Sequence, residues 1–401
     1  SSDLWAAFAT WFCDSLQIAS GYNLYMLVNK TWGELLTPFI YIAATAGFLL
    51  FKKPFGQPLY QVLFFAPLFF CLMKYALVRQ NSDPMLYAGV WVCAILATFA
   101  EAHERVHRLR AYGMLLLLAL TLSYAYSCAG AATYTHPYGL SFKHLRETLH
   151  LARTIEKTEV QTAENLKTAH FPEAWRTRIA QQPTLVLPID FSGLVADQLN
   201  ATPFYAFQGY SAYTHRLDQK SAARLAGDDA PTFIICEWFA LDNRNLFLES
   251  PAVWSTIHRY YRLVDSTPRW LLLQRGDPLP LPHIPQNAYS LPVGQWFSAE
   301  MPADPFIIVQ WPQTPLGVLI STFLRNDMTF LTVEYADGLQ MRYRILPDTL
   351  QAGFSMHRIP RHFEDLKSIF SAHPNPAMRI KRFKFDSNHG FYYKEDRKSV
   401  V

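Results

Sequence analysis

Charged side chains are scarce in this sequence, and their scarcity is uneven. Of 401 residues only 17% are Asp, Glu, Lys or Arg, compared with about 25% in soluble proteins. The first third is strongly apolar, whereas the remainder has the composition of an ordinary globular protein. The net charge is only +4, and no basic run of the kind that suggests nucleic acid is present, which argues against nucleic acid as a partner.

Cofactor and metal motifs are also missing. The five cysteines follow neither a zinc spacing nor a disulfide framework, so they fix no cellular compartment. The sequence contains no G-x-G-x-x-G, Walker loop or G-x-S-x-G motif. We therefore identify no cofactor, and a divalent metal is left open without a motif that supports it.

The sequence begins with "SSDLWAAF", without an initiator Met or a signal peptide. We expect the chain to be the C-terminal part of a longer protein, with further helices or a subunit upstream.

Four apolar segments are long enough to span a bilayer, which takes about 20 residues. They lie at 35–51, 59–78, 84–100 and 111–132. Lys52 and Lys53 follow the first segment and a basic stretch at 104–110 follows the third, so the positive-inside rule places both loops in the cytoplasm. The sequence thus predicts a multi-domain membrane protein of a bacterial inner membrane, with four α-helical transmembrane segments over 34–132 and extracytoplasmic C-terminal domains.

Residues 1–33 would share the outer side of this membrane. Apolar residues recur at helical spacing from Leu4 through Phe8 and Phe12 to Leu16, and Trp11 suits a membrane interface. We expect a helix that lies flat on membrane lipids. The alternative is a helix packed on the upstream part of a larger bundle.

A short outer loop and the end of the preceding segment carry charged residues. Asp83 precedes Pro84, which is typical of a helix start, and a lysine near a membrane surface can act as an anchor. The other interpretation is a clamp for a donor phosphate, with the lysine and the arginine as cations. The candidate phosphate-binding residues are Lys74, Arg79 and Asp83.

The region 133–280 alternates short apolar strands with helices after a long helix at 141–168. Such alternation indicates a small, mostly parallel α/β sheet. The predicted strands lie at 184–189, 202–208, 232–238, 262–264 and 270–275, and the predicted helices at 193–200, 214–227 and 251–261.

Polar and aromatic residues follow these strands, at the ends where such sheets usually bind ligands. Aromatic rings can stack on a sugar, while carboxylate, carboxamide and guanidinium groups pair with its hydroxyls. The alternative is a set of ordinary turn residues. The candidate sugar-binding residues are Asp190, Tyr210, Tyr213, Asp242, Asn243 and Arg244.

A proline-rich linker at 275–286 precedes a region, 281–401, in which apolar residues alternate. "PFIIVQW", "LGVLIST", "RIKRFKF" and "GFYYKED" read as strands, and 328–346 reads as a hairpin that turns at Asp337-Gly338. This pattern predicts an antiparallel, jelly-roll-like β-sandwich. Carbohydrate binding by such a module would be an inference from fold analogy alone.

The layout resembles membrane glycosyltransferases of the GT-C type, including bacterial arabinofuranosyl- and mannosyltransferase relatives. The resemblance rests on the short outer loops, the external α/β and sandwich modules, and the segments "FQGYSAYTHRLDQKSAARL" and "APTFIICEWFALDNR". It implies transfer of a sugar from a polyprenyl-phosphate donor to an extracytoplasmic glycan or lipid acceptor.

Four membrane segments are too few for such a bundle, so the catalytic carboxylate is expected upstream and no catalytic residue is named. The alternative is a non-catalytic, membrane-anchored carbohydrate-binding or assembly subunit. A transporter is less favoured, because the apolar segments contain almost no charge.

Overall fold

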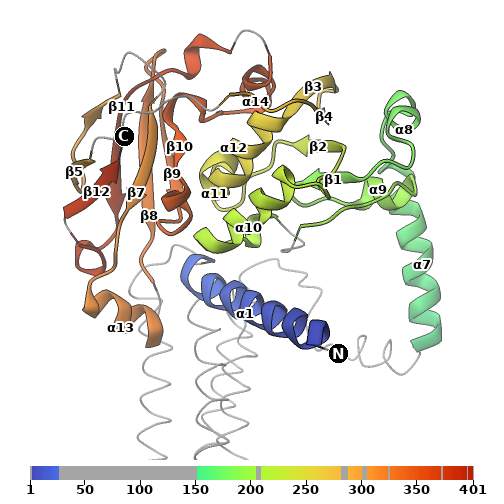
Figure 1. Cartoon of the computed structure of the whole chain (residues 1–401), viewed down its shortest axis with the longest axis horizontal. Coiled ribbons are helices and arrows are strands. Elements are labelled where there is room, and N and C mark those ends of the chain that lie inside the picture. Colours follow the sequence, from blue (N-terminus) through green and yellow to red (C-terminus); the bar gives the residue numbers. More distant parts are fainter. Residues whose placement is uncertain are drawn as a thin grey trace, which may run out of the picture. The chain divides into compact units, whose positions relative to one another are not determined.

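The computed structural model of the chain describes residues 2–26, 151–204, 209–280, 288–299, 305–323, 326–371, 374–394 and 396–400. The chain divides into two units, of which the first combines Ser1–Tyr25, Ser141–Val318 and Asp327–Val401. The elements below belong to this first unit, apart from the second half of α13 (Figure 1).

A four-stranded sheet with the order β1-β2-β4-β3 forms the centre of the N-terminal half of this unit. β1 and β2 are parallel, and Leu185 lies opposite Ile234 in their register. β4 is antiparallel to both of its neighbours. The strands are β1 (Thr184–Leu187), β2 (Phe233–Glu237), β3 (Tyr261–Ser266) and β4 (Trp270–Arg275).

The prediction of a mostly parallel sheet was therefore wrong. Only Thr267 to Arg269 connect β3 to β4, and a parallel crossover needs about a dozen residues or more. A connection this short forces the two strands to run antiparallel. A second error concerns the strand predicted at 202–208, of which residues 202–204 form no strand and 205–208 lie outside the description.

Helices pack on both faces of this sheet. Thr214 accepts a hydrogen bond from the Leu217 amide at the start of α10, which ends at Gly227, and Pro251 occupies the first turn of α12. These are common start and stop signals. The helices are α7 (Leu151–Lys167), α8 (Glu173–Ile179), α9 (Ser192–Ala196), α10 (His215–Ala226), α11 (Leu246–Glu249) and α12 (Pro251–Tyr260), with a 3-10 turn η1 (Gly209–Ser211) before α10.

Alternate residues of the strands enter two separate cores, as the two-residue period of a strand requires. Leu185, Ile234 and Leu273 pack with α10 and α12, whereas Val186 and Ile235 pack with α8 and α9. The first core also receives side chains from α14 (Phe363–Ile369) and the turn after it. A few residues of the region predicted as the β-sandwich domain thus take part in the core of the first sheet.

Two further sheets, both antiparallel, make up the C-terminal part, with the orders β10-β7-β12-β5 and β6-β11-β8-β9. Trp311, just after β7, is buried and packs edge-on against Phe385 of β11. The strands are β5 (Ala288–Pro292), β6 (Phe297–Ser298), β7 (Phe306–Gln310), β8 (Thr329–Tyr335), β9 (Gln340–Ile345), β10 (Phe354–Ser355), β11 (Ile380–Ser387) and β12 (Asp396–Val400).

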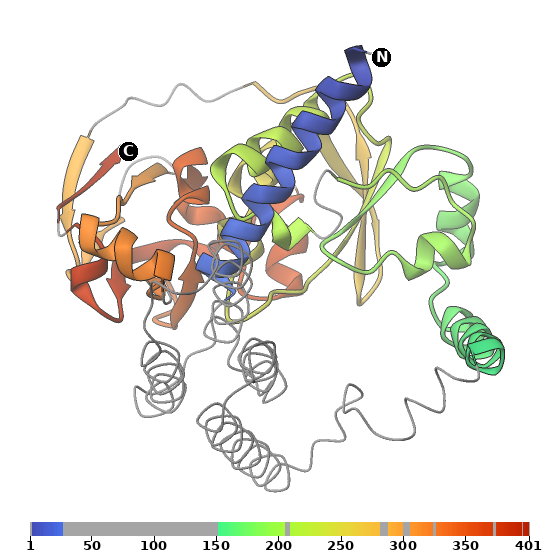
Figure 2. The same cartoon turned by 90° about the horizontal axis from the view of Figure 1, so that it is seen from below.

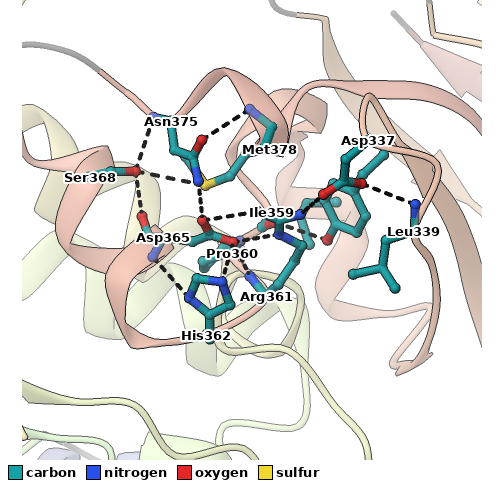
Figure 3. A network of polar contacts seen from close by, with 12 residues as sticks. Asp337, Leu339, Ile359, Pro360, Arg361, His362, Asp365, Ser368, Asn375 and Met378 are labelled. Atoms are coloured by element: carbon teal, nitrogen blue, oxygen red, sulfur yellow. Dashed lines mark hydrogen bonds and ion pairs between the residues drawn. The ribbon is translucent and has the colours of Figure 1, made fainter.

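The hairpin predicted at 328–346 is confirmed as β8 and β9, and Gly338 at its turn has φ +86°. Its turn residue Asp337 reaches Arg361 at 2.5 Å, and Arg361 in turn binds the buried carboxylate of Asp365 in α14 at 2.6 Å. Asn375 completes this network by donating to Asp365 at 2.7 Å (Figure 3). The network ties the hairpin to α14.

Two other predicted strands in this region were wrong. "LGVLIST" forms α13 (Pro315–Phe323), and most of "GFYYKED" forms a 3-10 turn, η5 (Gly390–Tyr392), and a single bridge. Short apolar runs do not distinguish a strand from a helix by periodicity alone. The proline at the start of α13 was the missed signal. The remaining 3-10 turns are η2 (Thr349–Ala352), η3 (Met356–Arg358) and η4 (Pro376–Met378).

The predicted fold class requires correction. Among the helices of the described residues, none combines the length and the apolarity needed to cross a bilayer. The four apolar segments on which the predicted bundle rested lie outside the described residues. What the structure describes is a mixed α and β unit with three four-stranded sheets, and its C-terminal part is rich in antiparallel strands.

Candidate functional site

One edge of the first sheet brings polar side chains together. Because β1 and β2 are parallel, their carboxyl ends meet at this edge, and the antiparallel β4 begins there, with Trp270 opposite Glu237. The loop after β1 supplies Asp190, and the turn before β4 supplies Arg269. The topology therefore places two carboxylates and one guanidinium at the same end of the sheet.

Arg269 joins the two carboxylates. Its Nε donates to Glu237 Oε1 at 2.7 Å, and its Nη2 lies 3.3 Å from both Glu237 Oε2 and Asp190 Oδ2. The guanidinium also lies over the ring of Trp270, 4.6 Å from its centroid. Asp190 accepts two further hydrogen bonds, from the amide and the hydroxyl of Ser192 at the start of α9. These contacts preorganise the site.

A polar cavity of about 110 Å³ lies against Asp190 and Arg269. A single water needs roughly 10–15 Å³ by the same measure, so the cavity has room for a small polar ligand. The end of α7 contributes Asn165 and Thr168 to the cavity lining. The lining residues are Asn165, Thr168, Ala169, Phe171, Asp190, Ser192, Gly193, Arg269 and Trp270.

The floor of the cavity depends on a glycine. A Cβ at Gly193 would overlap the ring of Phe171 and approach the Ala169 carbonyl at 2.8 Å. Phe171 also packs edge-on against Trp270, with 5.1 Å between the ring centroids. The segment after α7 can therefore approach α9 closely only because position 193 lacks a side chain.

The electrostatics keep the site charged at neutral pH. Burial alone would raise the pKa of Asp190, but the hydrogen bonds from Ser192 and the charge of Arg269 outweigh it and lower that pKa. The hydrogen bond with Glu237 raises the pKa of Arg269. Two carboxylates and one guanidinium leave a formal charge of −1, which favours a neutral or cationic ligand over a phosphate or a uronate.

Of the predicted sugar-binding residues, Asp190 lines this cavity, Tyr213 and Arg244 belong to a buried cluster, and Asp242 and Asn243 are exposed beside it. Arg244, 3% exposed, donates to Glu249 at 2.8 Å and to the Tyr25 carbonyl of α1 (Ser2–Tyr25) at 2.7 Å. Its guanidinium also lies 5.8 Å from the ring centroid of Tyr213, which is 1% exposed. Buried groups with these partners have a packing role.

Arg344 of β9 completes the buried cluster. It donates to the same Tyr25 carbonyl, its amide donates to the Asn243 carbonyl at 2.9 Å, and its guanidinium lies 3.7 Å from Asp242. Burial and the neighbouring charge of Arg244 lower the pKa of Arg344 to about 9. Asp242 and Asn243 shape a turn with φ of 52° and 60°. The turn interpretation of these two residues is thus supported by the backbone.

Tyr210 lies elsewhere, beside a second cavity of about 20 Å³ that is lined by apolar residues such as Leu187 and Trp254. The phosphate-binding candidates Lys74, Arg79 and Asp83 lie outside the described residues. No group of three or more His, Cys, Asp or Glu that could hold a metal occurs in the part of the chain that the structure describes.

Sequence reasoning missed most of the cavity. Glu237 and Arg269 were not singled out, because their proximity depends on the pairing of β2 with β4, which the sequence does not indicate. The contribution of Asn165 and Phe171 had no local signal either, because it depends on how α7 approaches α9. No family model matches the chain, and neither a curated protein nor a solved structure is significantly similar to it.

Proposed function

We propose that the chain binds a neutral saccharide in the cavity beside Asp190 and Arg269. The carrying observation is the cavity itself, which combines carboxylate, hydroxyl, carboxamide and guanidinium groups around a volume of about 110 Å³. A sugar offers many hydroxyls that both donate and accept, and these groups supply complementary partners in several directions. Binding pockets with a few convergent polar groups are the usual form of such sites.

The arrangement favours binding over proton transfer. A general base works best with a pKa near the operating pH, whereas Asp190 has a pKa below its ordinary value. Both carboxylates are also held by Arg269. Trp270 contributes a wall of the cavity, but the guanidinium covers one of its faces, so recognition would rest on hydrogen bonds rather than on ring stacking.

On this basis the chain serves as a carbohydrate-binding or assembly component in building extracytoplasmic glycans. Sugar transfer from a polyprenyl-phosphate donor remains a prediction of the sequence, because its candidate residues Lys74 and Arg79 lie outside the description. Replacing both with Gln should abolish transfer in an assay of the complete protein with a lipid-linked donor. Unchanged transfer would refute the prediction that these two residues bind the donor phosphate.

The binding proposal is tested by titrating the full chain with arabinose, mannose, galactose, glucose and N-acetylglucosamine in a calorimeter. We expect binding of at least one sugar. Asp190→Asn or Arg269→Gln should weaken it about tenfold or more, since a hydrogen bond to a charged group contributes about 1.5–3 kcal/mol. The matched control is Asp228→Asn, an exposed carboxylate outside the cavity. The proposal would be refuted if none of the sugars binds, or if both cavity variants bind sugar with the affinity of the unaltered chain.

A further inference from the structure

Helix α1 is attached to the rest of its unit by polar contacts. Asp14 pairs with Lys220 and lies 3.9 Å from Arg216, both on α10. Gln17 accepts a hydrogen bond of 2.8 Å from Thr214, the N-cap of α10. At its C-terminal end the buried cluster holds the last carbonyl of the helix. The side of α1 that faces the protein therefore carries Asp14 and Gln17, and near the end of the helix Gly21 packs closely against Tyr213.

The opposite side of α1 is apolar and exposed. The exposed fractions are 71% for Trp5, 51% for Phe8, 49% for Phe12 and 53% for Leu16. With about 100° of rotation per residue, these four positions fall within roughly 80° of one another and about opposite Asp14. We call them the outer stripe. Figure 2 shows α1 running along the face of the unit with its N-terminal end projecting.

This arrangement is the reverse of a helix on a water-soluble protein, which turns its apolar face inward. From Trp5 to Tyr25 the only charged residue is Asp14, and it faces α10. Nothing on the outer stripe interacts favourably with water, so four large apolar side chains in contact with water would be costly, at about 25 cal/mol per Å² of apolar surface.

The surroundings that fit this helix are lipid. In its first turns exposure is not confined to the stripe, because Trp11 is 62% exposed and Ala7, Ala9 and Cys13 are exposed as well. A protein partner would cover one face, whereas a wide exposed apolar surface suits a lipid interface. Tryptophan is enriched where a bilayer meets water. In the sequence, α1 also leads directly into the most apolar part of the chain.

We propose that α1 lies in the interfacial layer of a lipid bilayer, with the outer stripe among the acyl chains and the attached unit in water. The inference does not depend on the sugar cavity. Since residues 2–25 contain no Lys or Arg, the helix needs no anionic lipid. Phosphatidylcholine is sufficient, and salt does not weaken the interaction.

The test uses Cys13 as a local reporter, because it is exposed on α1. In a full-length chain with Cys71, Cys93 and Cys128 replaced by Ala, an environment-sensitive fluorophore is attached to Cys13, while the buried Cys236 escapes labelling. Phosphatidylcholine vesicles should shift its emission to the blue and reduce iodide quenching about fivefold, as expected for burial in the interface. Nitroxide lipids labelled near the headgroup should quench it more than lipids labelled deep in the chain.

Phe8→Asp with Phe12→Asp should restore iodide access in the presence of vesicles, without changing the circular dichroism spectrum. The matched control is Leu339→Asp, 46% exposed at the tip of the β8–β9 hairpin, which should leave shielding intact. Iodide access that vesicles do not change would overturn the proposal. Shielding of the fluorophore before lipid is added would also overturn it, because another part of the chain would then cover α1. Concentration-dependent self-quenching without lipid would overturn it as well, because a second copy of the chain would then cover α1.

Discussion

Arg244 and Arg269 occupy comparable chemical settings with different consequences. Each bridges a carboxylate to a second acceptor, Glu249 and a backbone carbonyl for the first, and Glu237 and Asp190 for the second. The side chain of Arg244 is 1% exposed, whereas that of Arg269 is 50% exposed. The arginine–carboxylate pair is therefore shielded from solvent at Arg244 and accessible to solvent at Arg269.

The comparison teaches that exposure, more than residue type, separates a structural cluster from a candidate binding site. In the buried cluster every strong partner is another part of the protein, so a ligand could enter only by displacing protein contacts. At the open site water competes for the same groups, and a sugar hydroxyl can replace that water at little cost. The variants below break or sharpen this contrast.

The largest effect is expected in the buried cluster. Glu249→Gln keeps the shape of the side chain but leaves Arg244 without its anionic partner, and breaking a buried pair from one side costs about 3–5 kcal/mol. Urea unfolding of the full chain should show this loss. A decrease of less than about 1 kcal/mol in the free energy of unfolding would mean that the Arg244–Glu249 pair is screened by solvent like an exposed pair.

Gly193→Ala should have the next largest effect. The added methyl would overlap Phe171, and overpacking of this kind typically costs about 1–3 kcal/mol. Because Gly193 and Phe171 both line the cavity, the affinity for sugar should decrease together with the free energy of unfolding. Gly390→Ala is the matched control, since a Cβ at Gly390 meets nothing within 4 Å. Equal stability of the two variants would contradict the close packing inferred here.

Sugar binding should resist mild acid. The lowered pKa of Asp190 keeps its carboxylate ionised at pH 5, so affinity should fall only as the pH drops below about 3.9, the ordinary value. Native-state stability from this group follows the same direction, being present at higher pH and lost on acidification. Calorimetric titrations from pH 6 downward measure the effect, with circular dichroism to verify folding. A fall between pH 6 and 5 would assign recognition to another group.

The smallest effect is expected for Glu237→Gln. The pair between Glu237 and Arg269 is partly exposed, and such pairs contribute about 0–1 kcal/mol. Urea unfolding should therefore change little, in contrast to Glu249→Gln. A loss of about 3 kcal/mol or more would erase the distinction between the two sites.

Local signals in the sequence were sufficient for several elements of the fold. The helix predicted at 214–227, with its stop at Gly227, corresponds to α10, and the turn predicted at Asp337-Gly338 corresponds to that of the β8–β9 hairpin. Each of these depends on residues only a few positions apart. The prediction was wrong where a short apolar run could form either kind of element, as in α13.

The candidate site could be predicted only in part, for the same reason. Asp190 directly follows a strand, so its position at the sheet edge was readable from the sequence. Arg244 also sits in a polar turn, but its acceptor is the carbonyl of Tyr25, 219 residues away in the chain. Nothing local distinguishes an arginine that faces solvent from one that meets a distant backbone group. Burial of that kind is a property of the assembled fold.

Two guanidinium groups bind the same backbone oxygen at the end of α1 and so connect the helix to two parts of the unit. Arg244 reaches Tyr25 from the loop before α11, and Arg344 reaches it from β9. A force on the end of α1 would therefore act on the loop before α11 and on β9 at the same time. A displacement of the helix, for instance by a change in the lateral pressure of its surroundings, would be transmitted to both the central sheet and the hairpin.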